Sequence, residues 1–261
     1  MSSPSKPSWF LQNNDVKNSV NIFCLFFALF LHGSCIDQKP SPALTLLPAN
    51  NISSKRIAIT SVELQMLQLG LVDISTIDST IKTDIKYSTT DNFLKTDIYG
   101  NYSKAYLQKD VAIKLAQAQA CLKELHPGYS LLIYDAARPV KFQKMIWDAL
   151  KVPAAEKGKY ASNAKNGSLH NFGAAVDLTI IDNSGKQFDM GCQFDYFNPL
   201  AYPVMESQLL DQGLLTQQQI DNRKLLRHVM SKAGFYNIQT EWWHFNSCTR
   251  EQAMLKYKII E

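Results

Sequence analysis

Apolar positions in the middle and near the end of the chain recur at helical spacing. Between residues 102 and 125 they form one stripe, made by Val111, Leu115, Ala118, Leu122 and Leu125. Asp110 stands where the regular part of this helix would be capped, and the sequence His-Pro-Gly at 126–128 ends it. Residues 218–233 carry a second apolar stripe, and Gly234 follows where a helix end favours glycine. Both segments are therefore predicted to be helices.

Shorter segments between these helices read as strands or loops. Residues 81–87 alternate apolar and polar side chains, which is typical of a strand. Further strands are predicted at 130–134, 174–181 and 235–245, and shorter helical patterns at 60–72 and 140–150. Residues 151–168 and 183–215 are expected to be irregular, because they are rich in glycine, asparagine or proline. This mixture predicts a single α+β domain over residues 56–261.

The chain ahead of this domain has the character of an export signal. Residues 1–18 are mostly polar, and residues 20–31 then read VNIFCLFFALFL, an apolar run with one polar side chain. The run is shorter than the roughly 20 residues that span a bilayer. It has the length expected in a signal peptide. We therefore expect a signal peptide over residues 1–34.

The end of this signal resembles the lipobox of bacterial lipoproteins, in which a cysteine becomes the acylated first residue of the mature protein. Gly33 and Ser34 precede Cys35, although His32 departs from the usual pattern. We expect acylation at Cys35, a proline-containing tether over 35–55, and a location on the periplasmic side of a bacterial membrane. Simple secretory cleavage and an uncleaved anchor are the alternatives.

Charge and cysteine spacing exclude several classes of function. The net charge is +4, from 27 basic and 23 acidic residues without a run of like charges, which indicates no nucleic-acid partner. Membrane contact is expected only through the N-terminal lipid or signal segment. The five cysteines contain no CxxC pair, so neither a thiolate zinc site nor a thioredoxin-like motif is indicated. We expect the cysteines of the domain, which are Cys121, Cys192 and Cys248, to be small packed side chains.

Two short motifs carry residues suited to metal chemistry: residues 168–177 read SLHNFGAAVD and residues 241–244 read EWWH. Catalytic zinc takes three protein ligands from histidines and carboxylates. His170, Asp177 and His244 would supply that set for one Zn²⁺ per chain. Gly173 permits the bend that the two ligands of the first motif require. Glu241 lies three residues before His244, close enough to act as general base without binding the metal.

Each of these residues alone would have an ordinary structural explanation, so their combination carries the prediction. The pattern SxHxxGxAxD followed by ExWH resembles zinc peptidases related to D-alanyl-D-alanine carboxypeptidases and to the Hedgehog signalling domain. Further segments resemble the VanX-type D-alanyl-D-alanine dipeptidases: IKYSTTDNF at 85–93, LIYDAARP at 132–139, MGCQFD at 190–195, and NR at 222–223 through GF at 234–235. The resemblance implies a small antiparallel sheet that carries the zinc site and is packed with several helices. It also implies hydrolysis of a small D,D-dipeptide.

The resemblance also implies roles for five further residues. Arg138 would bind the oxyanion of the tetrahedral intermediate, and Asp135 would orient Arg138. Tyr87 and Asp195 would recognise the free ammonium group of the dipeptide. Ser168 would contact the substrate backbone. Cys192 stands where the family has threonine, which leaves strict substrate choice open.

Two alternative functions are compatible with the same motifs. The first is a murein D,D- or L,D-carboxypeptidase or endopeptidase, and the pair Tyr87 and Asp195 favours the dipeptidase over it because an ammonium partner suits a free N-terminus. The second is a non-catalytic zinc-binding wall module, against which the presence of Glu241 and Arg138 counts. Export favours a role in recycling released wall peptide over glycopeptide resistance, which requires cytoplasmic hydrolysis.

Overall fold

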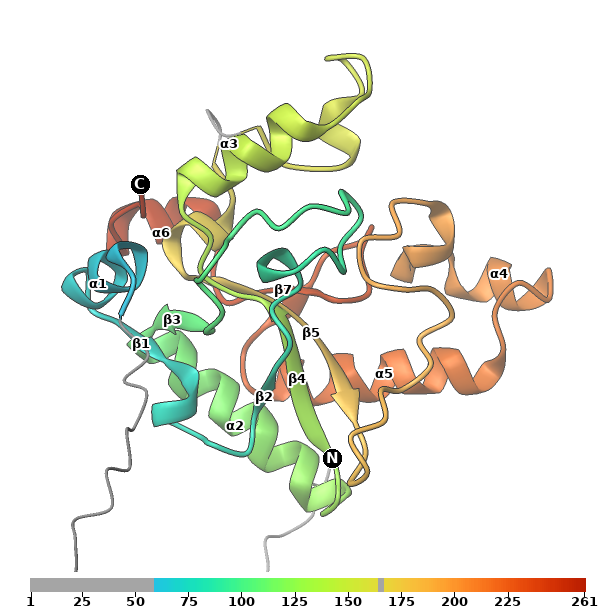
Figure 1. Cartoon of the computed structure of the whole chain (residues 1–261). Helices are drawn as coiled ribbons and strands as arrows, with labels where there is room; N and C mark the ends of the chain where they lie inside the picture. The colour runs from blue at the N-terminus through green and yellow to red at the C-terminus, as the bar shows by residue number, and fades with distance from the viewer. Residues whose placement is uncertain (1–58, 164–166) are drawn as a thin grey trace, which may run out of the picture. The chain divides into compact units, whose positions relative to one another are not determined.

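A computed structural model describes residues 59–163 and 167–261 (Figure 1). The predicted signal peptide, the tether and Cys35 lie outside the described residues. The helices are α1 (Ser61–Gln68), α2 (Lys109–Leu125), α3 (Val140–Ala149), α4 (Glu206–Asp211), α5 (Gln217–Lys232) and α6 (Arg250–Lys256). None of these helices in the described part of the chain is long and apolar enough to cross a membrane.

A mixed five-stranded sheet forms the centre of the domain. Its strands are β2 (Lys82–Thr83), β4 (Ser130–Asp135), β5 (Ala175–Ile181), β7 (His244–Asn246) and β6 (Tyr236–Asn237), in that spatial order. Only β2 and β4 are parallel, and the other neighbours are antiparallel. Two further strands, β1 (Leu71–Asp73) and β3 (Tyr106–Gln108), form a separate antiparallel pair. The prediction of an α+β fold with a small, largely antiparallel sheet is confirmed.

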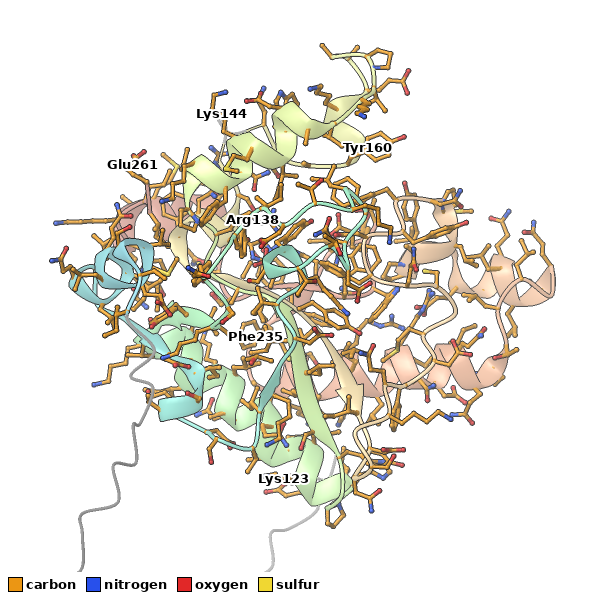
Figure 2. The ribbon with its side chains drawn as sticks, viewed as in Figure 1. Lys123, Arg138, Lys144, Tyr160, Phe235 and Glu261 are labelled. Carbon is orange, nitrogen blue, oxygen red and sulfur yellow. The ribbon has the colours of Figure 1, made fainter. Side chains whose placement is uncertain are left out.

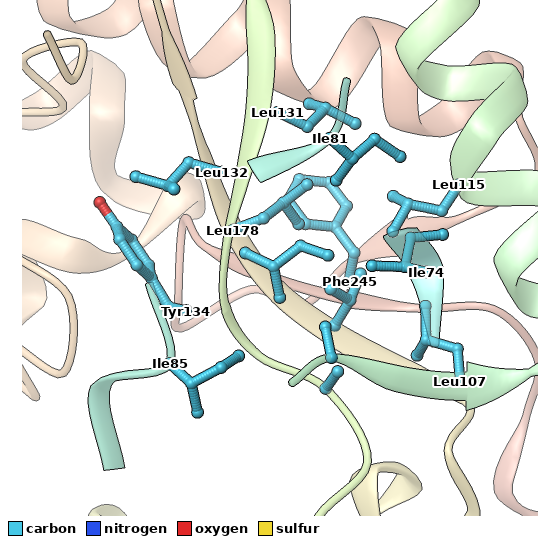
Figure 3. Close-up of a cluster of buried hydrophobic side chains, with 14 of the residues drawn as sticks. Ile74, Ile81, Ile85, Leu107, Leu115, Leu131, Leu132, Tyr134, Leu178 and Phe245 are labelled. Atoms are coloured by element: carbon cyan, nitrogen blue, oxygen red, sulfur yellow. The ribbon is translucent and has the colours of Figure 1, made fainter. Parts of the chain in front are cut away.

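The apolar core lies between this sheet and the two long helices. Residues paired across antiparallel strands face the same side of a sheet. Leu131 pairs with Ile180 and Ile133 with Leu178, and all four are buried. Their face of the sheet packs against the apolar stripes of α2 and α5, and Figure 3 shows part of this cluster. The opposite face carries Leu132, which pairs with Thr179, and farther along the sheet it carries polar side chains.

A β-bulge in β4 determines which residues reach that opposite face. Ile133 faces the core, and a regular strand would continue by placing Asp135 opposite Val176, whose side chain is also in the core. The register shifts between Ile133 and Asp135, so Tyr134 is an extra residue. Asp135 therefore pairs with Asp177, and both carboxylates lie on the polar face.

The long helix predicted in the middle of the chain differs at both ends from the helix in the structure. The helix predicted from residue 102 begins at Lys109, because Tyr106–Gln108 forms β3 instead. Asp110 is in the first turn rather than at the cap, where its carboxylate binds Lys256 and Tyr257, and Leu125 is 49% exposed. Both expectations were wrong, because the helix begins directly after β3 with Gln108 as its N-cap and its apolar stripe is buried only as far as Leu122.

The other differences are in the shorter segments. In the segment 81–87, only the first part is a strand, and a 3-10 helix at Lys86–Ser88 follows it. The segment 235–245 contains the hairpin of β6 and β7 rather than one strand. The irregular segment 183–215 contains α4. The domain's three cysteines are free and half-buried.

Candidate active site

Three side chains that suit a metal ion come together from three elements. His170 lies in a 3-10 helix at Leu169–Phe172, Asp177 in β5 and His244 in β7. Asp177 and His244 are a register pair, so their side chains share the polar face of the sheet. Gly173 ends the 3-10 helix at a φ of 63°, which turns the chain from His170 into β5. A Cβ atom there would lie 2.8 Å from a methyl group of the buried Leu71, so a larger residue would have to displace Leu71 as well as adopt a positive φ.

The candidate ligand atoms are spaced as one tetrahedral metal ion needs. His170 Nε2 lies 3.1 Å from His244 Nδ1 and 3.4 Å from Asp177 Oδ1, and His244 Nδ1 lies 2.9 Å from Asp177 Oδ1. Zinc–ligand bonds of about 2.0–2.1 Å at tetrahedral angles separate ligand atoms by about 3.3 Å. These three groups therefore fit a single small metal ion.

Hydrogen bonds to the far side of each imidazole select the tautomer that a metal requires. His170 Nδ1 lies 2.6 Å from the carbonyl oxygen of Ala136, so it carries the proton and leaves Nε2 as a ligand. His244 Nε2 lies 2.9 Å from Asn246 Oδ1, which leaves Nδ1 as its ligand. Asn246 was not among the residues predicted from the sequence. Its position two residues after His244, on the same face of a strand, was the available signal.

The ligand group is buried and strongly coupled. Burial alone would raise the pKa of Asp177, but the neighbouring His170 and hydrogen bonds from both histidines hold that pKa below its usual range. Burial alone would lower the pKa of His244, whereas its hydrogen bond to Asp177 raises it to about 9. A metal ion would take the place of the proton that His244 Nδ1 shares with Asp177, because a ligating imidazole must be neutral.

Glu241 stands beside this group without belonging to it. Its Oε2 atom lies 4.0 Å from His244 Nδ1, and its side chain is 24% exposed. Burial raises the pKa of Glu241, and the nearby Asp177 acts in the same direction. A carboxylate so placed is suited to accept a proton from a water molecule next to the metal.

Arg138 is held in the interior beneath α3 in the view of Figure 2. Its Nε donates to Asp135 Oδ2 at 2.8 Å, and its Nη2 also donates to that oxygen. Nη2 lies 3.7 Å from Asp177 Oδ2, so the guanidinium reaches the ligand group. Tyr99, which the sequence analysis missed, donates its hydroxyl to Asp135 Oδ1 at 2.9 Å. Both carboxylate oxygens of Asp135 therefore have hydrogen-bond partners. Arg138 lines the cavity that the ligand group also lines, whereas Asp135 does not.

A second acidic group lies across the site from the ligands. The hydroxyl of Tyr87 donates to Asp195 Oδ2 at 2.8 Å, and both residues are buried. Asp195 has a φ of 59°, a conformation that is uncommon for residues other than glycine. Burial raises the pKa of Asp195 well above its ordinary value, which indicates a carboxyl group short of positive partners.

One cavity of about 290 Å³ joins these groups. It is lined by polar side chains that the sequence analysis named, which are Tyr87, Arg138, Ser168, His170, Asp177, Asp195, Glu241 and His244. Ser168 caps the 3-10 helix that carries His170. Apolar side chains complete the wall, among them Ile146, Tyr160, Phe197 and Ile238. Of the predicted residues of the domain's site, only Asp135 is outside this lining.

The hydrogen bond from His244 to Asn246 leads to a test of the metal centre. Replacing Asn246 by Ala frees the His244 ring to rotate and change tautomer, so metal affinity should fall by about 10–100-fold. Competition with a chelator measures that affinity. Asn237→Ala is the matched control, because Asn237 binds backbone carbonyls of the same hairpin and not the imidazole ring. Equal metal affinity in Asn246→Ala and the wild type would contradict this assignment.

Comparison with known proteins places the chain in a family. The Peptidase M15 family described as "D-ala-D-ala dipeptidase" matches residues 67–259. The D-alanyl-D-alanine dipeptidase of Escherichia coli (strain K12) is 34% identical over 175 residues, which is 67% of this chain and 83% of that protein. The enzyme of the same name from Synechocystis is 27% identical over 168 residues, 54% of this chain and 68% of its own length.

Among solved structures, one of the LdcB LD-carboxypeptidase is similar over 57% of this chain and 63% of its own, with a TM-score of 0.36 and 20% identity. The family match covers most of the domain and includes every residue of the cavity named above. The chain belongs to the Peptidase M15 family of D-alanyl-D-alanine dipeptidases and is a metallopeptidase.

Proposed function

We propose that this protein is a zinc-dependent dipeptidase that hydrolyses D-alanyl-D-alanine to free D-alanine. The observation that carries the proposal is the content of a single cavity. It combines a three-residue ligand group, a separate carboxylate at Glu241, the guanidinium of Arg138 and an acidic pocket made by Tyr87 and Asp195. Relatives that bear the dipeptidase name support the choice of substrate.

The residues of the chain have distinct parts in the proposed reaction. When His170, Asp177 and His244 hold zinc, the metal supplies Lewis-acid chemistry at the scissile carbonyl. Glu241 accepts the proton of the attacking water and passes it to the leaving amine. Arg138 directs N–H groups at the oxygen that becomes negative during the attack.

The shape and charge of the cavity favour a small substrate with a free amino group. The buried Asp195 and the Tyr87 hydroxyl provide an acidic pocket for an ammonium ion. Ser168 lies at the cavity wall, where it contacts the substrate backbone in this proposal. A volume of about 290 Å³ suits a dipeptide with methyl side chains. An ammonium partner suits the free N-terminus of a dipeptide, so the dipeptidase is favoured over a carboxypeptidase acting on murein stems.

The central test separates catalysis from metal binding. Glu241→Ala should keep about one zinc per chain, because the three ligands remain. Turnover of D-alanyl-D-alanine should fall by about 10³–10⁴-fold, since Glu241 serves in two proton transfers. His170→Ala should lose both zinc and activity. Elemental analysis and kcat are measured together, with the exposed Glu124→Ala as control.

Two results would overturn this proposal in different ways. Near-normal turnover in zinc-loaded Glu241→Ala would remove Glu241 from the mechanism. A wild-type protein that binds zinc but hydrolyses neither D-alanyl-D-alanine nor murein fragments would instead be a zinc-binding wall module.

We further propose that the protein is exported and anchored as a lipoprotein at Cys35, outside the described residues. The apolar run at 20–31 followed by Gly33, Ser34 and Cys35 supports this location. An exported enzyme does not reach the cytoplasmic dipeptide pool, so it serves recycling of peptide released from the wall.

Mass spectrometry of the native protein tests the anchor. The mature chain should begin at an acylated Cys35, and Cys35→Ala should move the protein out of the membrane fraction. Cys24→Ala, within the signal itself, is the control and should change neither property. An unmodified Cys35 inside a longer chain would refute the lipoprotein assignment.

A further inference from the structure

We propose that Gln143 is a positioning residue that sets the orientation of the Arg138 guanidinium toward the reacting carbonyl. This inference rests on the proposed role of Arg138 in oxyanion binding. Gln143 lies in the first turns of α3, five residues after Arg138, and its side chain is fully buried. It does not line the cavity that holds the metal ligands.

Asp135 alone does not fix the guanidinium. Arg138 donates from Nε and from Nη2 to one and the same oxygen, Asp135 Oδ2. An arginine that donates to two different carboxylate oxygens has a defined orientation. Two donors that share one oxygen allow the guanidinium to rotate about that oxygen. The second oxygen, Oδ1, is taken by the Tyr99 hydroxyl and the Ala136 N–H, each at 2.9 Å. The usual two-oxygen fork is therefore closed to Arg138.

Gln143 provides a second hydrogen-bond acceptor that holds the guanidinium. Its Oε1 accepts a hydrogen bond from Arg138 Nη1 at 3.0 Å, on the opposite side of the guanidinium from Asp135. Its Nε2 donates to the carbonyl oxygen of Ser162 at 2.9 Å. That second bond settles which end of the amide faces Arg138, because a flipped amide would set oxygen against oxygen and donor against donor. The Tyr87 ring, whose centroid lies 5.2 Å from Arg138 Cζ, packs against the guanidinium, and the two fixed acceptors define its rotation against that ring.

This arrangement leaves the catalytically useful donors free. Arginine has five N–H groups. Asp135 and Gln143 take three of them, so Nη1 and Nη2 each retain one. Nη2 lies 3.7 Å from Asp177 Oδ2, which places its free donor beside the ligand group. Loss of a whole oxyanion partner costs about 10²–10³-fold, so loss of its alignment should cost about tenfold in kcat.

Two substitutions at Gln143 separate alignment from simple packing. Gln143→Met keeps the length of the side chain and removes both hydrogen bonds, so kcat should fall about tenfold while KM changes less than about threefold. Gln143→Glu keeps an acceptor for Arg138 Nη1 but loses the donor to Ser162, so its kcat should exceed that of Gln143→Met. Zinc content should equal that of the wild type in both variants.

Gln119→Met is the matched control. Gln119 is also fully buried and binds backbone groups, the Leu131 N–H at 2.7 Å and the Tyr129 carbonyl at 3.2 Å, and it does not line the cavity. It should lower the melting temperature and leave kcat unchanged.

A double-mutant cycle with Arg138→Ala provides the decisive comparison. If Gln143 acts through Arg138, adding Gln143→Met to Arg138→Ala should change kcat by less than about twofold. An undiminished tenfold loss in that background, or equal losses in Gln143→Met and Gln143→Glu, would overturn the inference and leave the role of Arg138 intact. Wild-type turnover in Arg138→Ala would instead overturn the proposed role of Arg138 itself, and this inference with it.

Discussion

Acidic side chains outnumber cationic ones among the described residues that line the cavity. This imbalance accounts for the raised pKa values in the site and for the positive partners that it is proposed to bind. Asp177, Asp195 and Glu241 line the cavity, whereas Arg138 is the one permanent cation among the described residues of its lining and is already paired with Asp135. Burial of an unpaired carboxylate is costly, which explains why the pKa values of Asp195 and Glu241 are raised. A divalent metal at Asp177 and a substrate ammonium at Asp195 would supply the missing positive charges. The proposed cofactor and the proposed substrate are therefore the partners that this cavity lacks by itself.

The fold brings these charges together through local irregularities in an otherwise regular sheet. The bulge at Tyr134 turns Asp135 from the apolar core to the side that holds Asp177. The left-handed Gly173 returns the chain so that His170 meets that same side. The polar face is consequently built from neighbours in β4, β5 and β7, where backbone hydrogen bonds hold the spacing. Rigid strands suit a site that must keep its ligand atoms about 3 Å apart.

Patterns within short stretches of sequence predicted the helices and the spacing of the metal-ligand motif. The stripes of α2 and α5 and the spacing between His170 and Asp177 are short-range features, and the structure has them where expected. The start of α2 was misplaced because β3 pairs with β1, a strand over thirty residues earlier. Three supporting residues, Tyr99, Gln143 and Asn246, escaped notice because they are ordinary residue types outside any motif. Their importance arises from hydrogen bonds to Asp135, Arg138 and His244, and of the three only Asn246 had a sequence signal, its spacing from His244.

The charge balance of the cavity is tested most directly by removing the charge of the substrate. Acetylation of the amino group of D-alanyl-D-alanine abolishes the ammonium while leaving the scissile bond unchanged. The ratio of kcat/KM for the free and the N-acetylated dipeptide then measures what the pocket of Tyr87 and Asp195 contributes. We predict a loss of at least about 100-fold on acetylation, because a buried carboxylate would lose its partner. Equal or faster turnover of the acetylated substrate would contradict the account and indicate a carboxypeptidase.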